Sequence, residues 1–170
     1  MTRRNRLIVC AALLAGAAAI SGCPSGPQQV SKRPPPPVAD VEGIVPLTPP
    51  AATNWDGRPG ADGLQVSVLL FRPGEGLPVT VRGALECVVY EGIIRGDQLT
   101  DARPWRSWRF GPDDLRQRVV RTAYGWGYAV ILPWGPTGPG TSSVTLVVRY
   151  HPPEGPAVAS QATVVPVTAK

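Results

Sequence analysis

The sequence predicts a mainly β protein: an antiparallel β-sandwich of six or seven strands with one short helix, after a disordered proline-rich linker. Two observations predict this class. Short segments that alternate apolar and polar side chains recur from residue 61 onward, which is the pattern of half-buried strands. The connections between them have hairpin length, and none is long enough to hold the crossover helix of a parallel sheet.

The first two strands are predicted at residues 64–70 and 79–90. In the first, apolar residues at the even positions alternate with Gln65 and Ser67, and the turn Arg-Pro-Gly-Glu-Gly follows. The second strand is long enough to bend near Gly83. Glycine and proline between two apolar segments are typical of a turn.

A third strand is predicted at residues 105–110, and the only convincing helix signal after residue 60 follows it at residues 111–117. Pro112 lies near the first turn, where its missing N–H costs nothing. Asp113 and Asp114 are favoured there because carboxylates interact well with the start of a helix. A helical turn explains this acidic pair better than half of a calcium site, because the spaced acidic loop of calcium motifs is missing.

The remaining strands are predicted at residues 126–134, 144–150 and 158–167, with a Gly-Pro-rich turn between the first two. Pro166 marks the last one as an edge strand or a strand end. The number, length and rhythm of these strands resemble the immunoglobulin-like β-sandwich. The resemblance concerns architecture only, because the paired cysteines of antibody domains are absent.

Residues 24–60 differ in composition from residues 61–170. They contain ten of the 21 prolines and a single aromatic residue, Trp55, with no sustained apolar period. Such a segment cannot bury enough surface to offset its ordering entropy, so it is predicted to be a semi-rigid, partly polyproline II tether before a folded domain at residues 61–168. The alternative is that residues 38–47 add an edge strand to that domain.

The N-terminus has the features of an export signal. Three arginines precede an apolar segment of fourteen residues, 7–20, and small residues follow it. A helix that crosses a bilayer needs about 20 apolar residues. The segment is therefore too short for a transmembrane anchor, and residues 1–22 are predicted to be a signal peptide.

The end of this segment, Ile20-Ser21-Gly22-Cys23, resembles the lipobox of bacterial lipoproteins. The resemblance implies cleavage between Gly22 and Cys23 and a diacylglyceryl group on the Cys23 thiol. Residues 23–60 then become a lipidated tether on the outer membrane or on the periplasmic face of the inner membrane. Two or more acyl chains give lasting attachment, because each buried CH₂ contributes about 0.8 kcal/mol.

Removal of the signal peptide leaves 14 basic and 12 acidic side chains, so the mature chain is nearly neutral and gives no footprint for a nucleic acid. Cys10 leaves with the signal peptide and Cys23 carries the lipid, so Cys87 is the only cysteine of the folded domain. It shares a strand face with Leu85 and Val89 and is expected to be a small buried hydrophobe, not a reactive thiol.

No arrangement of residues predicts an enzyme, a cofactor or a metal site. The only histidine, His151, lies at a strand end, without a Gly-x-Ser-x-Gly turn elsewhere or nearby metal ligands, and is expected to be ordinary surface. Glu86 and Glu91 have opposite parity in their strand and face different ways. The expected function is therefore not catalytic.

Tryptophan and arginine concentrate in residues 103–134, and the candidate binding surface is Trp105, Arg106, Trp108 and Arg109. Trp105 and Trp108 differ in parity, so on one strand one would point inward and the other outward. An exposed ring among arginines would stack on a sugar or on a protein partner. The simpler interpretation is that these rings fill the core of a small domain without disulfides.

These features predict an envelope lipoprotein whose domain binds another envelope protein or supports an assembly. A carbohydrate- or cell-wall-binding module that uses the tryptophan and arginine surface is the alternative. An enzyme is a third and weaker one. The two binding hypotheses differ in one observable feature, which is whether Trp105 or Trp108 is exposed in a flat row with other rings.

Overall fold

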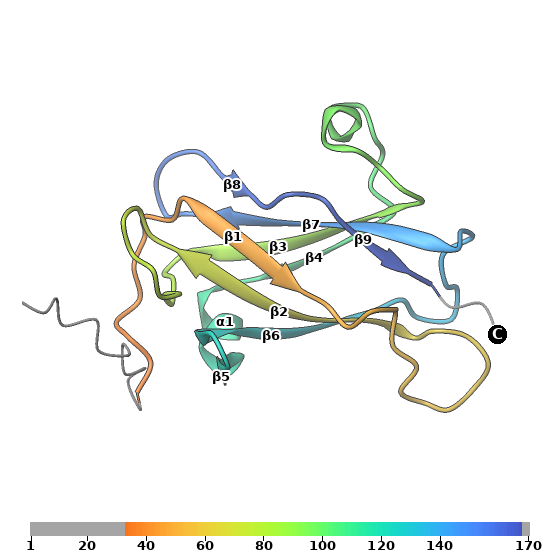
Figure 1. Ribbon diagram of the computed structural model, residues 1–170, viewed down its shortest axis with the longest axis horizontal. Helices are drawn as coiled ribbons and strands as arrows, with labels where there is room; N and C mark the ends of the chain where they lie inside the picture. The colour runs from red at the N-terminus through yellow and green to blue at the C-terminus, as the bar shows by residue number, and fades with distance from the viewer. Residues whose placement is uncertain (1–32, 168–170) are drawn as a thin grey trace, which may run out of the picture.

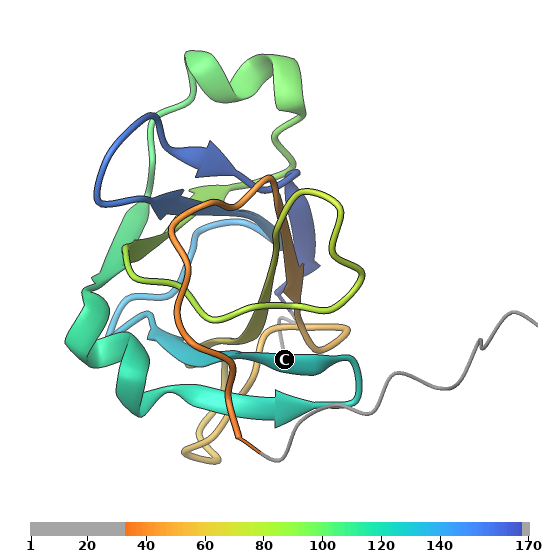
Figure 2. The same cartoon turned by 90° about the vertical axis from the view of Figure 1, so that its left-hand side faces the viewer.

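A computed structural model describes residues 33–167 and shows two antiparallel β-sheets that face each other across one core (Figures 1 and 2). The first sheet has the strand order β1-β2-β6-β5, and the second has the order β4-β3-β7, with β8 and β9 both paired to β7. The strands are β1 Gly43–Leu47, β2 Gly63–Phe71, β3 Ala84–Glu91, β4 Arg106–Phe110, β5 Val119–Thr122, β6 Gly125–Pro133, β7 Ser143–His151, β8 Val158–Ala159 and β9 Thr163–Pro166. The helical elements are the 3₁₀-helix η1 Gly96–Thr100 and the α-helix α1 Pro112–Gln117.

The prediction of a mainly β fold with two antiparallel layers and one short α-helix is confirmed. The strands predicted at residues 64–70, 79–90, 126–134 and 144–150 correspond to β2, β3, β6 and β7. The described part of the chain has nine strands where six or seven were expected. The last predicted strand is observed as two, β8 and β9, which both pair with β7; between them the Ser160 hydroxyl accepts from the Val148 N–H in place of a backbone carbonyl. Two short strands, β1 and β5, were not in the main prediction.

The core follows from strand alternation. Even positions of β2 and β6, such as Val66 and Val130, and odd positions of β3, such as Leu85, point between the sheets and are fully buried. Cys87 lies in this core, as predicted, opposite Val148 of β7. β7 is buried on both faces over Val144–Val148, so it is the central strand of the second sheet.

A small second core covers the outer face of that sheet. Val88, Tyr90 and Val147 point outward there and pack against Ile94, Leu99 and Ala102 from the connection that contains η1. Thr145, which is also buried, fixes this connection: its hydroxyl donates to the carbonyl of Gly92 at 2.8 Å and accepts from the Ile94 N–H at 2.9 Å. The outer face of β3 and β7 is therefore covered over part of its length.

The predicted boundary between tether and domain at residue 61 is wrong. β1 lies in the region that was assigned to the tether, and it pairs with β2 over its whole length, from Gly43 opposite Phe71 to Leu47 opposite Ser67. Ile44 of β1 is buried in the main core. The minority interpretation, an edge strand within residues 38–47, is the one that the structure shows.

The reason lies in how the prolines are used. Proline lacks an N–H but keeps its carbonyl, and the carbonyls of Pro35 and Pro37 accept hydrogen bonds from the Thr80 hydroxyl at 2.7 Å and from Arg82 Nε at 2.8 Å. Val38 also forms a parallel bridge with Val81. Pro46 is tolerated because β1 lies at the edge of its sheet. Composition alone predicted disorder, whereas donors on the neighbouring segment, Thr80 and Arg82, pair with the proline carbonyls.

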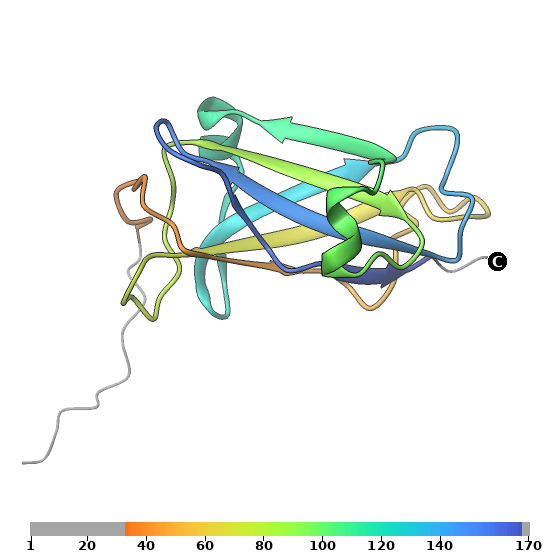
Figure 3. The same cartoon turned by 90° about the horizontal axis from the view of Figure 1, so that it is seen from above.

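The two ends of this two-sheet body differ (Figures 1 and 3). Residues 33–42 lie at one end, together with α1 and the connection between β2 and β3; we call this the entry end. Residues 48–62 and 134–142 lie at the opposite end, which we call the loop end, and β9 runs toward it. The long strands β2, β6 and β7 connect the two ends.

Candidate binding cleft at the loop end

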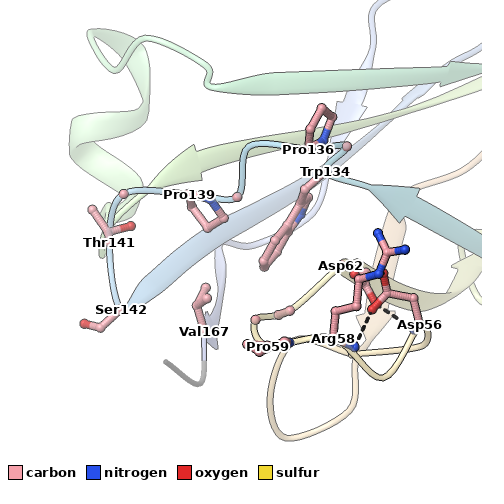
Figure 4. A pocket seen from close by; sticks show the side chains of 15 residues that line it. Asp56, Arg58, Pro59, Asp62, Trp134, Pro136, Pro139, Thr141, Ser142 and Val167 are labelled. Atoms are coloured by element: carbon pink, nitrogen blue, oxygen red, sulfur yellow. Dashed lines mark hydrogen bonds and ion pairs between the residues drawn. The ribbon is translucent and has the colours of Figure 1, made fainter. Parts of the chain in front are cut away.

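A cleft of about 680 Å³ opens at the loop end, between residues 56–62 and the connection from β6 to β7. Figure 4 shows Asp56, Arg58 and Asp62 on one wall, Pro139, Thr141 and Ser142 on the other, and Trp134 between them. Val167 closes it from the C-terminal side. The lining mixes an aromatic ring, prolines, hydroxyls and both signs of charge, which is the composition of a site for a ligand with polar and apolar parts.

The first wall is a loop held by its own side chains. Asp62 Oδ2 accepts from the backbone N–H groups of Trp55 at 2.6 Å and Asp56 at 3.0 Å. Asn54 accepts from the N–H of Gly57 at 2.8 Å and donates to the carbonyl of Gly60 at 2.6 Å. In this loop, hydrogen bonds between side chains and the backbone take the place of the strand-to-strand hydrogen bonds of a sheet. The loop therefore has a defined shape without belonging to either sheet.

The second wall is tied to the first by the backbone. The N–H of Trp134 donates to the carbonyl of Asp62 at 2.8 Å, and the N–H of Val167 donates to the carbonyl of Ser142 at 2.8 Å. Gly140 donates to Glu91 Oε1 at 2.7 Å. Three separate segments of the chain thus meet at this cleft, and it exists only because the strands bring them together.

Arg58 is the most accessible charge of the cleft. Its side chain is 86% exposed, and its Nε lies 3.9 Å from Asp56 Oδ2. An exposed pair at that distance contributes little to stability. The guanidinium therefore remains available to a partner, while Asp62 is used by the loop itself.

Trp134 forms the floor of the cleft and is fully buried. Its ring meets that of Trp105 edge to face, with 5.9 Å between the centroids, an arrangement that adds to apolar burial. The Arg106 guanidinium lies 4.9 Å from the centre of the Trp105 ring. Trp105 and Arg106 of the predicted binding surface therefore lie beside the cleft, as a layer that supports its floor.

The other half of the predicted surface lies elsewhere. Trp108 is in β4, opposite Cys87 of β3, and packs partly buried against the main core. Arg109 is exposed and faces the other way, opposite Glu86. The structure thus separates the four residues that the sequence grouped, and only Trp105 and Arg106 adjoin the cleft.

Neither Trp105 nor Trp108 presents a flat exposed ring, because both pack against the main core. Of the five tryptophans of the chain, all within the described residues, only Trp55 is exposed, at 46%. The expectation of one inward and one outward ring fails because Trp105 precedes β4 and does not share its alternation. The observation that would have favoured a stacking surface for sugars on these two residues is not met.

A second polar group lies on the outer face of β3 and β7. His151 Nε2 is 3.0 Å from Glu86 Oε2, Arg149 Nη1 is 3.8 Å from the same oxygen, and Arg149 Nη2 donates to the Tyr90 hydroxyl at 3.3 Å. His151 was predicted to be ordinary surface. It is partly buried and has a partner 65 residues away, which only the register of β3 and β7 brings close. These residues do not line the cleft, and the group joins the two strands.

Burial, with a contribution from the neighbouring Glu86 carboxylate, raises the pKa of Cys87 to about 12, so its thiol stays protonated. Among residues 33–167, no three His, Cys, Asp or Glu side chains are grouped as metal ligands. In the same range, no helix is long and apolar enough to span a bilayer. The predicted signal peptide, Gly22 and Cys23 lie outside the described residues.

Comparison of the chain with protein-family models, with curated proteins and with solved structures gives no match.

Proposed function

We propose that this protein is a lipid-anchored protein of the bacterial cell envelope whose immunoglobulin-like body binds a partner, without catalysis, through the cleft at the loop end. The membrane part of the proposal depends on the leader that ends in Ile20-Ser21-Gly22-Cys23. The expected sites are the outer membrane or the periplasmic face of the inner membrane.

The main support for the proposal is that the N-terminal side of the described chain and the cleft lie at opposite ends of the body. The described chain begins at the entry end, whereas the cleft and its loops lie at the loop end (Figure 1). A body attached through its N-terminal side thus presents the cleft away from the attachment. Loops on a rigid sheet scaffold are where binding residues concentrate in proteins of this architecture.

The corrected boundary shortens the tether. Only residues 24–32 separate Cys23 from the first described residue, and nine residues span at most about 30 Å even when fully extended. The entry end is then held near the membrane surface. A tether made of the whole segment 24–60 would have reached much further.

The first experiment tests the attachment. Mass spectrometry of the N-terminal peptide is expected to show acyl chains on Cys23, and Cys23→Ser is expected to move the protein from the membrane fraction to the soluble fraction. An unmodified Cys23 thiol, or cleavage at another position, would contradict the anchor.

The second experiment tests the cleft. The tethered protein is used as bait in a native envelope preparation, and capture of each partner is compared between Arg58→Ala and Arg116→Ala. Both arginines are exposed, with side-chain exposures of 86% and 71%, but Arg116 lies in α1 at the entry end. Truncation of a hot-spot residue costs about 2 kcal/mol or more, or roughly thirtyfold in affinity.

We therefore expect Arg58→Ala to reduce capture strongly and Arg116→Ala to leave it unchanged. Equal capture by the two variants would remove the cleft from the proposal and leave only the location. Binding of cell-wall glycan that Trp55→Ala abolishes, with Arg58→Ala unaffected, would instead favour the carbohydrate-binding alternative.

A further inference from the structure

The outer face of the sheet β1-β2-β6-β5 carries no charged side chain at any strand position. The strands alternate, so the residues that point away from the core are the odd positions of β1, β2 and β6 and the even positions of β5. These are Gly43, Val45, Leu47, Gly63, Gln65, Ser67, Leu69, Phe71, Gly125, Gly127, Ala129, Ile131, Pro133, Val120 and Thr122. We call this set the uncharged face.

Two large apolar side chains of the uncharged face are exposed, whereas Leu69 on the same face is only 3% exposed. Ile131 is 53% exposed and Val45 is 43% exposed. Near the middle of the face no side chain protrudes from Gly127. The Leu69 side chain fills the space above this glycine, where a Cβ would be 2.7 Å from Leu69 Cδ2. The charged residues nearest in sequence lie just beyond the strand ends: Glu42 before β1, Asp62 before β2, Arg72 after β2 and Arg118 before β5.

The outer face of the second sheet differs from the uncharged face in its coverage and in its charge. It is partly covered by the connection that contains η1, through Val88 and Tyr90. Where it is open, it carries Glu86, Arg149 and His151. One protein thus has two sheet faces of opposite character. The uncharged face has no charge at its strand positions, and other segments approach it at its ends, with Trp55 beside Gly63 and Pro78 beside Gly125. Exposed apolar surface of this kind marks an interaction site in soluble domains.

We propose that the occupant of the uncharged face is a second copy of this chain, packed sheet against sheet. A face without charges can meet itself without like-charge repulsion, which is the condition that a two-fold interface imposes on every residue near its axis. Two sheet faces pack closely at about 10 Å when their side chains are small and apolar. Alanine, serine and glycine in the centre, with isoleucine and valine toward the rims, meet that requirement.

The area predicts a weak dimer. With strands about 4.8 Å apart and a rise of about 3.3 Å per residue, the four strands cover a flat area of about 430 Å² on each copy. Stable interfaces bury about 800 Å² per partner. Association in dilute solution is therefore expected to be weak, and a raised local concentration is needed to populate the pair.

The proposed anchor supplies that concentration, and in this respect the inference depends on the proposed function. The uncharged face runs along the long axis of the body, parallel to the line between the entry and loop ends (Figure 3). A two-fold axis in that direction places both entry ends on the same side. Two copies attached to one membrane can then pair through these faces with both clefts pointing outward, and confinement to one surface raises their effective concentration.

The test is cross-linking of the full-length protein in native membranes. Gln65→Cys places an exposed thiol on central strand β2 of the uncharged face, and Arg109→Cys places one on the outer face of the other sheet. A short bis-maleimide is expected to give a dimer with Gln65→Cys and none with Arg109→Cys. Cys87 does not interfere, because it is buried, and the unsubstituted protein, treated in the same way, reports any cross-link through Cys10 or Cys23.

A second substitution identifies the contact. Ile131→Glu, added to Gln65→Cys, introduces a charge opposite position 65 in the register of β2 and β6 and is expected to reduce cross-linking about thirtyfold, as expected for loss of a hot spot. Val164→Glu is the matched control, since Val164 is 42% exposed but belongs to β9 of the other sheet. Its cross-linking is expected to equal that of Gln65→Cys alone.

Absence of a Gln65→Cys dimer, an equal dimer from Arg109→Cys, or insensitivity to Ile131→Glu would each overturn the proposal. A thermal-unfolding midpoint for Ile131→Glu within a few degrees of that of the parent excludes loss of the fold as the cause. Membrane fractionation of the same samples reports on the anchor separately. A soluble protein that still cross-links at high concentration would retain the interface and reject the anchor.

Discussion

Cys87 shows how position decides the chemistry of a single residue. The same thiol at a helix N-terminus or beside a cation would be a nucleophile, but here it lies between the sheets, opposite Trp108 on one side and Val148 on the other. Burial favours the neutral thiol over the thiolate, and the nearby Glu86 carboxylate acts in the same direction. Cys87 is therefore a packing residue.

We expect Cys87 to resist alkylation in the folded protein, since its pKa of about 12 leaves almost no thiolate at neutral pH. The folded-state pKa is above the unfolded one, near 9.0, so the unfolded state loses its proton first. The folded protein should accordingly lose stability as the pH rises above about 9. Iodoacetamide labelling, with mass spectrometry to locate the modified cysteine, checks the first point. Equal labelling rates with and without urea would contradict it.

At the entry end, the pKa of Asp40 is shifted downward, in the opposite direction to that of Cys87. Hydrogen bonds to its carboxylate, first from Arg72 at 2.7 and 2.9 Å, hold the pKa of Asp40 below its usual value of 3.8. This interaction connects the segment before β1 to the end of β2. Both side chains are exposed, at 37% for Arg72 and 56% for Asp40, so the effect of this interaction is local.

We expect an NMR titration to give Asp40 a pKa below 3.8, and Arg72→Gln to return it toward that value. Because the folded-state pKa is lowered, the stabilisation from this carboxylate is present above the unfolded pKa and is lost as the pH falls through the folded one. The difference in unfolding midpoint between the parent and Arg72→Gln should therefore vanish at low pH. A difference that persists unchanged below about pH 2 would rule out this origin.

At the scale of elements, the start of β2 shows how closely the loop end is packed. A Cβ on Gly63 would lie 2.3 Å from the Leu132 carbonyl oxygen and 2.6 Å from Cη2 of Trp55. The carbonyl belongs to the neighbouring strand β6 and cannot move without disturbing the ladder. Gly76, in the turn after β2, has no atom within 4 Å of the same position.

Gly63→Ala is therefore expected to destabilise the fold by about 1–3 kcal/mol through overpacking, while Gly76→Ala leaves the free energy of unfolding within about 0.5 kcal/mol of the parent value. Urea unfolding at equilibrium measures both. Similar stability of the two variants would show that β2 and β6 separate more easily at this end than the structure indicates.

At the scale of the whole molecule, the segment before β2 belongs to the folded unit. β1 is bonded along its length to β2, Ile44 is buried, and residues 35–39 are bonded to the connection between β2 and β3. The Tyr150 hydroxyl also donates to the Ala39 carbonyl at 3.1 Å. Removal of residues 33–47 would therefore expose the core along the edge of β2 and at the entry end.

We expect a variant that begins at residue 33 to unfold at the same urea concentration as the mature protein. One that begins at residue 48 should lose more than the roughly 2–5 kcal/mol that truncation of one buried isoleucine costs. Equal stability of the two truncated proteins would restore the predicted boundary at residue 61.

The sequence by itself determined the class of fold and the strongest strands, because period-two alternation is a local property and β2, β3, β6 and β7 carry it over most of their length. It also predicted the burial of Cys87 from parity alone. Its predictions of a leader and of lipidation at Cys23 stay predictions, since those residues lie outside the described part of the chain.

The tertiary structure decided what depends on residues far apart in the chain. β1 forms because β2 offers it an edge, and the prolines before it are accommodated because Thr80 and Arg82 donate to their carbonyls. The cleft joins residues 56–62 to residues 134–142, and Glu86 meets His151 only through the register of β3 and β7. Composition and periodicity report on neighbours in sequence, whereas strand register sets these contacts, and register is fixed only when the whole core packs.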